Sequence, residues 1–154
     1  MLTLVHEPLA AGNAALPEVP VRVDRITIAK RRWRGKAEDG RELGFELATP
    51  LKDGDVVFQS AEARYVVRQL PENVLEVSLA MPASAAAGIG WAIGNLHLEL
   101  QAESDRLLAL DEPAVRQLLE RLKVPFRPVT AIFRPGRFVR GNLASHELRP
   151  SHKH

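Results

Sequence analysis

The sequence predicts an α+β protein with an N-terminal all-β domain (residues 1–78), a C-terminal domain of strands and helices (79–140) and a flexible, histidine-containing tail (141–154). Three observations lead to this division. Up to about residue 79, apolar residues alternate with a period of two between turn signals, as in strands. Beyond residue 80, an alanine-rich stretch and a stripe with helical spacing indicate helices. From Gly141 onward the chain is polar without periodicity, which is typical of a mobile terminus.

In the N-terminal domain the alternation is clearest from Leu43 to Leu47. Ile26 and Ile28 also alternate, but in the opposite register to the valines before them. We therefore expect a strand with a bulge or break near Asp24–Arg25. Asp-Gly pairs such as Asp53–Gly54 are turn signals, because glycine tolerates positive φ and aspartate can bond nearby backbone.

The C-terminal domain shows four strand-like and two helix-like segments in alternation. In order they are a strand at 74–79, a helix at 83–93, strands at 96–100 and 107–110, a helix at 111–122 and a strand at 129–133. This β-α-β-β-α-β order predicts a ferredoxin-like domain. In the second helix we expect Asp111 at the N-cap, Pro113 in the first turn, and an apolar stripe ending at Leu122.

Composition excludes several classes of site and of protein. The chain has 154 residues and no cysteine, which excludes disulfides, thiolate nucleophiles and thiolate metal sites. No apolar run approaches the roughly 20 residues needed to span a bilayer, and we expect no membrane partner. The N-terminus lacks a cationic start, so we expect no signal peptide and a cytoplasmic location.

No arrangement of side chains in the sequence indicates catalysis. The serines lie in no nucleophile elbow, and neither paired carboxylates nor a histidine base can be assigned. Gly88, Gly90 and Gly94 lack the ending of a phosphate loop, and they fall in or at the end of the expected helix. We interpret them as small residues that let this helix pack closely on a sheet or a partner, and we expect no enzyme activity.

The segment KRRWRGK, Lys30 to Lys36, has five cations and a tryptophan in seven residues. Such a segment can contact phosphates and stack on bases, so a small RNA-binding protein is the alternative reading. The other interpretation is a solvated strand end, which the acidic residues from Glu38 onward favour. A later run of arginines leaves the same two interpretations open.

The histidines are the candidate metal ligands. His152 and His154 are two residues apart, so in an extended segment their imidazoles face the same way, and His146 is near enough to join them. Neutral imidazole binds nickel, copper, zinc and cobalt well. His97 stands alone between two leucines. Spacing by itself leaves open a chance tail and a histidine that makes a local hydrogen bond.

Several segments together resemble a known family. They are DGRELGFEL (39–47), LKDGDVV (51–57), AIGNLH (92–97), DEPAVRQLL (111–119) and FRP (133–135). In these segments the chain is similar to the UreE family of urease accessory proteins, over roughly Val21 to Phe138 and the histidine-bearing end. Where the family usually has arginine between the asparagine and the histidine of Gly-Asn-x-His, this chain has Leu96.

The resemblance implies a non-enzymatic nickel metallochaperone that delivers Ni²⁺ for assembly of the urease active site; Cu²⁺, Zn²⁺ or Co²⁺ are possible ligands in vitro. It implies a peptide- or partner-binding β domain and a ferredoxin-like domain that forms a homodimer. Two copies of His97 would share one metal ion at the dimer interface, with His146, His152 and His154 as auxiliary ligands. The implied partners are the urease apoprotein and the urease accessory proteins, including the accessory GTPase, and no nucleic acid.

Overall fold

The chain forms two compact units, Met1–Leu70 and Pro71–His154. The computed structural model describes residues 1–10, 12–138 and 146–147. The unit boundary lies at Leu70 rather than after residue 78, because β7 (Glu72–Ser78) pairs with β9 (Arg106–Leu110) and β10 (Arg127–Ala131) of the second unit. Helices and strands are present in both units, so the protein is α+β.

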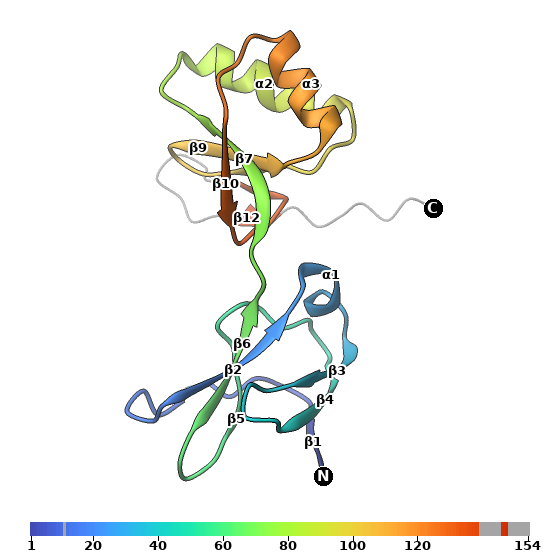
Figure 1. Ribbon diagram of the computed structural model, residues 1–154, viewed down its shortest axis with the longest axis vertical. Helices are drawn as coiled ribbons and strands as arrows, with labels where there is room; N and C mark the ends of the chain where they lie inside the picture. Colours follow the sequence, from blue (N-terminus) through green and yellow to red (C-terminus); the bar gives the residue numbers. More distant parts are fainter. Residues whose placement is uncertain (11, 139–145, 148–154) are drawn as a thin grey trace. The chain divides into compact units, whose positions relative to one another are not determined.

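The N-terminal unit is built from two three-stranded sheets (Figure 1). Its further elements are β1 (Leu2–Val5), β2 (Glu18–Val23), α1 (Arg25–Ile28), β3 (Arg32–Lys36), β4 (Glu42–Glu46), β5 (Val56–Gln59) and β6 (Arg64–Gln69). One sheet has the order β1-β4-β3 and the other β2-β6-β5. A shared core includes Val21, Leu43 and Val67, which are fully buried. The alternation from Leu43 to Leu47 thus places one face of β4 in this core.

A short helix, α1, stands where the sequence predicted a strand through Ile26 and Ile28. Asp24 caps it, with the carboxylate accepting a 2.8 Å hydrogen bond from the Thr27 backbone N–H. This turn, rather than a bulge, absorbs the change of register after β2. It buries Ile28 and leaves Ile26 exposed.

The Asp-Gly-Asp segment forms the turn before β5. Gly54 has a φ of 92°, in the left-handed region that favours glycine. The carboxylate of Asp53 accepts a hydrogen bond from the Gln69 N–H at 2.7 Å, and that of Asp55 accepts one from the Lys52 N–H at 2.7 Å. Both aspartates therefore stabilise the turn by accepting backbone hydrogen bonds.

The C-terminal unit follows the predicted β-α-β-β-α-β order. Its other elements are α2 (Ala83–Asn95), β8 (Gln101–Ala102), α3 (Pro113–Arg121), β11 (Arg137–Phe138) and β12 (His146–Glu147). The main sheet has the antiparallel order β10-β7-β9-β8, and α2 and α3 lie together on one face of it (Figure 1). Leu75, Val77, Ile93 and Leu119 pack between this sheet and the helices.

Three local predictions for this unit were wrong. No strand forms at 96–100, because α2 continues to Asn95 and a turn follows; the short β8 begins only at Gln101. Glu112, not Asp111, is the N-cap of α3, and Asp111 instead accepts hydrogen bonds from Arg116. Leu122 lies beyond α3 with 43% of its surface exposed, outside the apolar stripe. The expected tail from residue 141 lies outside the described residues, apart from β12.

Glu76 joins three strands on the sheet face opposite the helices. Its carboxylate accepts hydrogen bonds from Arg106 on β9 at 2.8 Å and from Arg127 on β10 at 2.6 Å. The bond from Arg106, followed by that from Arg127, lowers the pKa of Glu76 below its ordinary value. Glu76 therefore favours the folded state while it is ionised.

We expect Glu76→Gln to lower the urea midpoint at neutral pH and to have a smaller effect near pH 2. Because the folded-state pKa is depressed, this contribution is complete above the unfolded value of about 4.3 and is lost as pH falls through the folded value. Urea titrations at both pH values test this, with exposed Glu120→Gln as the control of equal charge. An equal loss at both pH values would mean that packing, not ionisation, is responsible.

Candidate metal centre

His97 occupies a special backbone position immediately after α2. The helix ends at Asn95, Leu96 is the C-cap, and His97 follows with a φ of 58°, in the left-handed region. The His97 N–H donates to the Gly94 carbonyl at 2.9 Å, and the Leu98 N–H donates to the Ile93 carbonyl at 3.3 Å. These two bonds define a Schellman motif, in which the left-handed position is usually glycine.

The same motif ends α3, with Lys123 at the corresponding position. Lys123 has a φ of 55°, its N–H donates to the Glu120 carbonyl at 3.0 Å, and the Val124 N–H donates to the Leu119 carbonyl at 2.9 Å. A left-handed non-glycine residue costs roughly 1–2 kcal/mol. His97 and Lys123 both bear this backbone cost and both have exposed side chains.

The surface around His97 is apolar and exposed. Trp91, on the outer side of α2, has 71% of its surface exposed, and Leu96 has 47% exposed. A Cβ atom added at Gly88 or Gly94 would meet no atom of the described residues within 4 Å. Each helical glycine costs about 1 kcal/mol relative to alanine, and neither of these two makes room for the protein's own sheet. The sequence predicted that these glycines let the helix pack closely on either a sheet or a partner. At Gly88 and Gly94 the protein's own sheet is not what packs against the helix.

Trp91 is the residue that sequence reasoning missed. An aromatic side chain in a helix made mostly of alanine, glycine and isoleucine was a visible signal. Without the helix phase, that signal could not separate a core tryptophan from a surface one. The structure shows which side of the helix faces the core, because Ile89 and Ile93 are buried and Trp91 is not.

The other predicted ligands stand differently. Within the part of the chain that the structure describes, no group of three or more histidine and carboxylate side chains could hold a metal ion. His146 is in β12, where its backbone pairs with Phe138 of β11. His152 and His154 lie outside the described residues. Among the described residues, a single chain thus brings no set of three such ligands together at His97.

The segment that leads to the tail is tied to the strand after His97. The Gly136 N–H donates to the Leu100 carbonyl at 2.8 Å, three residues beyond His97. The buried side chain of Gln101 accepts a 2.7 Å hydrogen bond from the Arg134 N–H and donates to Glu103 at 3.0 Å. Gln101 was not predicted from the sequence, although a polar residue between apolar strand positions was the available signal. These bonds hold the beginning of the histidine-bearing segment, at Gly136, close to His97.

The basic segment Lys30–Lys36 is not built for base stacking. Trp33 points into the core, where it stacks on Phe45 with ring centroids 3.9 Å apart. Arg32 pairs with Glu46 at 2.9 Å across the strands. The cations of this segment therefore stand on a strand whose aromatic side chain is unavailable to a nucleic acid.

Comparison with known proteins bears on this geometry. Residues 72–154, more than half of the chain, match the family described as UreE urease accessory protein, C-terminal domain. The chain belongs to the UreE family. It is 31% identical over 131 residues to urease accessory protein UreE of Geobacillus kaustophilus, covering 80% of this chain and 88% of that protein. It is 33% identical over 119 residues to urease accessory protein UreE of Deinococcus radiodurans, covering 76% of each chain.

The family assignment confirms the resemblance drawn from the sequence segments. This UreE family member is an accessory protein and not an enzyme. None of the helices that the structure describes is long and apolar enough to cross a membrane. In this member of the UreE family, the Gly-Asn-x-His signature is the Schellman turn itself: Gly94 supplies the carbonyl that the His97 N–H binds, and Leu96 is the cap.

Proposed function

We propose that this chain is a nickel metallochaperone that delivers Ni²⁺ for assembly of the urease active site. In this proposal a homodimer binds one metal ion between two His97 side chains. The observation that carries it is the exposed imidazole of His97, fixed in a left-handed turn at the end of a helix whose outer face is apolar. A rigid turn holds a ligand in one place, as a shared metal site requires.

A two-fold axis would explain how a single histidine per chain can form a metal site. In a symmetric dimer the interface puts each residue near its own copy, so one histidine per chain becomes a pair of imidazoles. The outer face of α2 fits such an interface: Trp91 is an anchor of the kind that dominates binding energy, and Gly88 and Gly94 allow a second helix to approach closely. Leu96, in place of the family's usual arginine, adds apolar surface beside the ligand.

The tail supplies the remaining ligands in this proposal. The hydrogen bond from Gly136 to Leu100 starts the segment near His97, and β12 holds the backbone of His146 opposite Phe138. His152 and His154 follow further along the chain. A site that combines one fixed imidazole per chain with ligands from a tail can lose the latter stepwise. Stepwise loss lets the protein bind an ion tightly and still transfer it.

The domain roles follow the same proposal. The C-terminal unit is the ferredoxin-like, metal-binding and dimerising domain, its end carries the auxiliary histidines, and the N-terminal unit docks peptides or partner proteins. Its partners are the urease apoprotein and the urease accessory proteins, including the accessory GTPase, in the cytoplasm. Copper should bind at least as tightly as nickel in vitro, with zinc and cobalt as further ligands, so affinity alone does not identify the cellular metal.

Equilibrium dialysis of the full chain against Ni²⁺ tests the central site. We expect one tightly bound ion per two chains, and binding that weakens as pH falls, since protons compete with the metal for imidazole. The double variant His152→Ser/His154→Ser should keep this stoichiometry and lose affinity. One tight ion per chain, or tight binding that disappears with the two tail histidines while His97 is intact, contradicts the shared site.

A further inference from the structure

The outer face of the β1-β4-β3 sheet carries an ordered arrangement of side chains. In the register of the three strands, Leu4 on β1 lies beside Gly44 on β4, and Gly44 lies beside Arg34 on β3. Leu2 occupies the next outward position on β1. The opposite face of these strands is the buried core, so this outer face is free of the unit's own packing.

Two hollows follow β4 on this face and share Leu2 and Arg34. One has a volume of about 380 Å³ and is bordered by Leu4, Gly44 and Glu46 among others; the second, of about 280 Å³, extends toward Lys36. Gly44 lets the two leucine side chains of β1 lie close over β4, because a Cβ there would lie 3.1 Å from Leu2 Cδ2 and 3.2 Å from Leu4 Cδ2. We call these hollows together the Gly44 groove.

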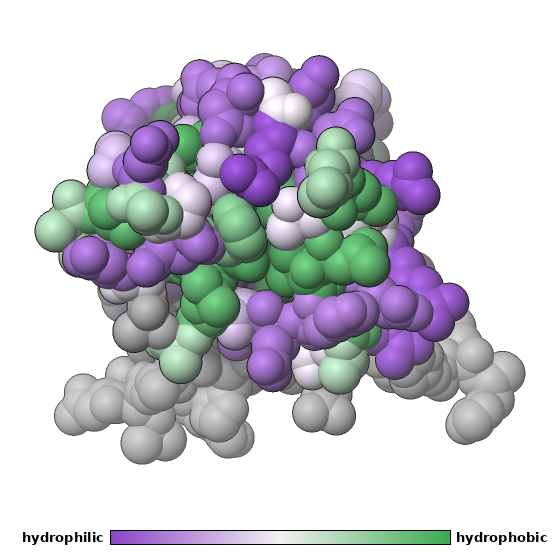
Figure 2. Space-filling view, turned by 90° about the horizontal axis from the view of Figure 1, so that it is seen from below, coloured by the Kyte–Doolittle hydropathy of each residue, from purple (hydrophilic) through white to green (hydrophobic). Residues whose placement is uncertain are grey.

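The groove has one apolar wall and one cationic wall. Leu2 and Leu4, the latter 64% exposed, stand on β1, and the cations stand on β3 two strands away. Two strand spacings are about 10 Å, the width of one extended chain. Viewed from the end where β1 and β4 lie in Figure 1, the surface shows a hydrophobic band bordered by hydrophilic atoms (Figure 2).

One cation of this wall has no carboxylate. Arg32 pairs with Glu46 at 2.9 Å, and Lys36 lies opposite Glu42 in the strand register. Arg34 lies opposite Gly44, which offers no side chain, and it has no ion pair within the described part of the chain. The three cations and two carboxylates of this face therefore leave Arg34 unmatched, directly above the glycine floor.

We infer that the Gly44 groove binds an extended acidic segment of a partner protein, with a carboxylate on Arg34 and an apolar side chain against Leu2 and Leu4. Successive side chains of an extended peptide point to opposite sides, so alternating acidic and apolar residues reach the two walls. Guanidinium binds carboxylate through two parallel hydrogen bonds. This inference deepens the partner-docking role proposed for the N-terminal unit and does not depend on metal delivery.

Two other occupants fit the groove less well. The chain's own end, residues 139–154, carries Arg140, Arg149 and Lys153 against one acidic residue, Glu147, so its charge is of the wrong sign. A nucleic acid would bring phosphates close to Glu42 and Glu46, and Trp33 is buried beneath the sheet. A protein segment with isolated carboxylates matches Arg34, the cation of this wall that faces no carboxylate in the strand register.

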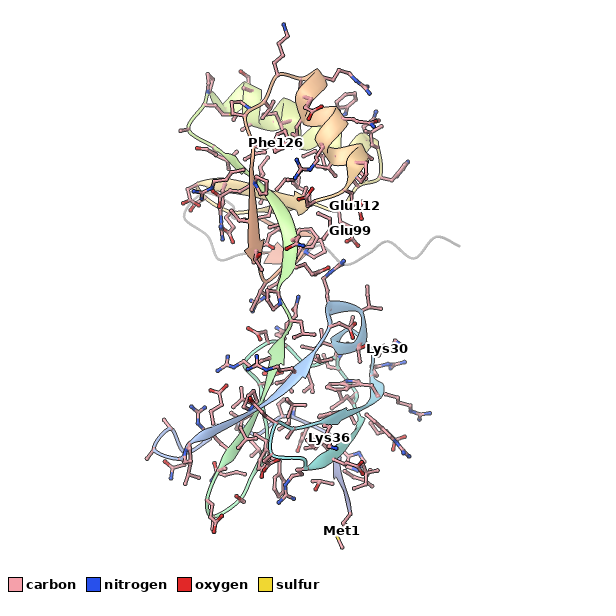
Figure 3. All side chains as sticks on the ribbon, viewed as in Figure 1. Met1, Lys30, Lys36, Glu99, Glu112 and Phe126 are labelled. Atoms are coloured by element: carbon pink, nitrogen blue, oxygen red, sulfur yellow. The ribbon has the colours of Figure 1, made fainter. Side chains whose placement is uncertain are left out.

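The test uses the full-length, ¹⁵N-labelled chain and a hexapeptide of alternating leucine and glutamate, acetylated and amidated so that its carboxylates are side chains. We expect amide shifts in NMR spectra at Leu4, Arg34 and Gly44. Arg34→Glu should weaken binding by at least about tenfold. Lys30→Glu, with the same charge change at a position that lines neither hollow, should leave binding within about twofold (Figure 3).

Distinct outcomes would overturn the inference. Absence of shifts at millimolar peptide, equal loss in the Arg34 and Lys30 variants, or equal binding of a leucine–lysine peptide would each do so. Shifts at the same amides with an RNA oligonucleotide but not with the peptide would assign the groove to nucleic acid. Nickel dialysis of the Arg34 variant runs in parallel, since normal metal binding with lost peptide binding separates the groove from the proposed metal site.

Discussion

His97→Gly is expected to stabilise the metal-free protein by about 1 kcal/mol while it abolishes tight nickel binding. Glycine adopts the left-handed conformation at this position without the strain that His97 bears, although part of the gain is offset by the freer unfolded chain. The imidazole is lost at the same time. Urea unfolding in EDTA at fixed protein concentration gives the first quantity, and equilibrium dialysis against Ni²⁺ gives the second.

Lys123→Gly is the matched control for this prediction. Lys123 ends α3 in the same Schellman motif, with a φ of 55° against 58° for His97. We expect Lys123→Gly also to stabilise the metal-free protein, and to leave nickel binding intact. His97→Ala completes the set, because it removes the imidazole without relieving the backbone. If His97→Ala keeps the wild-type nickel stoichiometry and affinity, His97 is not the central ligand.

If the proposed homodimer forms through the outer face of α2, Trp91→Glu is expected to convert it to a monomer. In a symmetric interface each substitution is present twice, and removal of a buried tryptophan anchor typically costs at least ~2 kcal/mol. The introduced carboxylates would also face each other across the axis. The dimer dissociation constant should therefore rise by at least about a hundredfold. Sedimentation velocity over a concentration series measures this, in the presence of EDTA so that metal does not link the chains.

Leu122→Glu is the control for surface charge in the same unit. Leu122 is an exposed apolar residue, as Trp91 is, but it stands after α3 and outside the proposed interface. It should leave the oligomeric state unchanged. The Trp91 variant should also lose tight nickel binding although His97 is intact, because a shared site needs both chains. A Trp91→Glu protein that sediments as a dimer would remove the outer face of α2 from the interface.

Much of the fold was predictable because burial follows a period that the sequence displays. Leu43 and Phe45 alternate with exposed glutamates, and β4 is a strand with one face in the core. Val115, Leu118 and Leu119 have helical spacing and are buried in α3. These patterns report local burial, which needs no knowledge of partners.

The wrong predictions of secondary structure lie where the chain changes direction within a few residues. Ile26 and Ile28 fit an alternating pattern, but Asp24 can accept hydrogen bonds from the following N–H groups, and that capping creates α1 instead. The strand expected through His97 failed for a similar reason, since two hydrogen bonds from beyond the helix end create a Schellman turn there. Such turns depend on individual hydrogen bonds to the backbone, which produce no periodic pattern in the sequence.

The candidate centre was only partly predictable. His97 was singled out by its family signature, and the histidine itself gave no sign of its left-handed backbone. The exposure of Trp91 depends on the phase of α2, and the tie between Gly136 and Leu100 joins positions far apart in the sequence. Both are tertiary facts, beyond the reach of a local pattern.

The bond between Gly136 and Leu100 makes the histidine-bearing segment a tether of defined origin. The backbone of His146 lies opposite Phe138, two residues after Gly136. His152 follows His146 by six residues, so it can be at most about 20 Å from His146 along the chain. A ligand on a short tether has an effective concentration in the millimolar range, which falls as the tether lengthens. In the metallochaperone that we propose, the number of residues between His146 and His152 would help to set how long an ion stays captured.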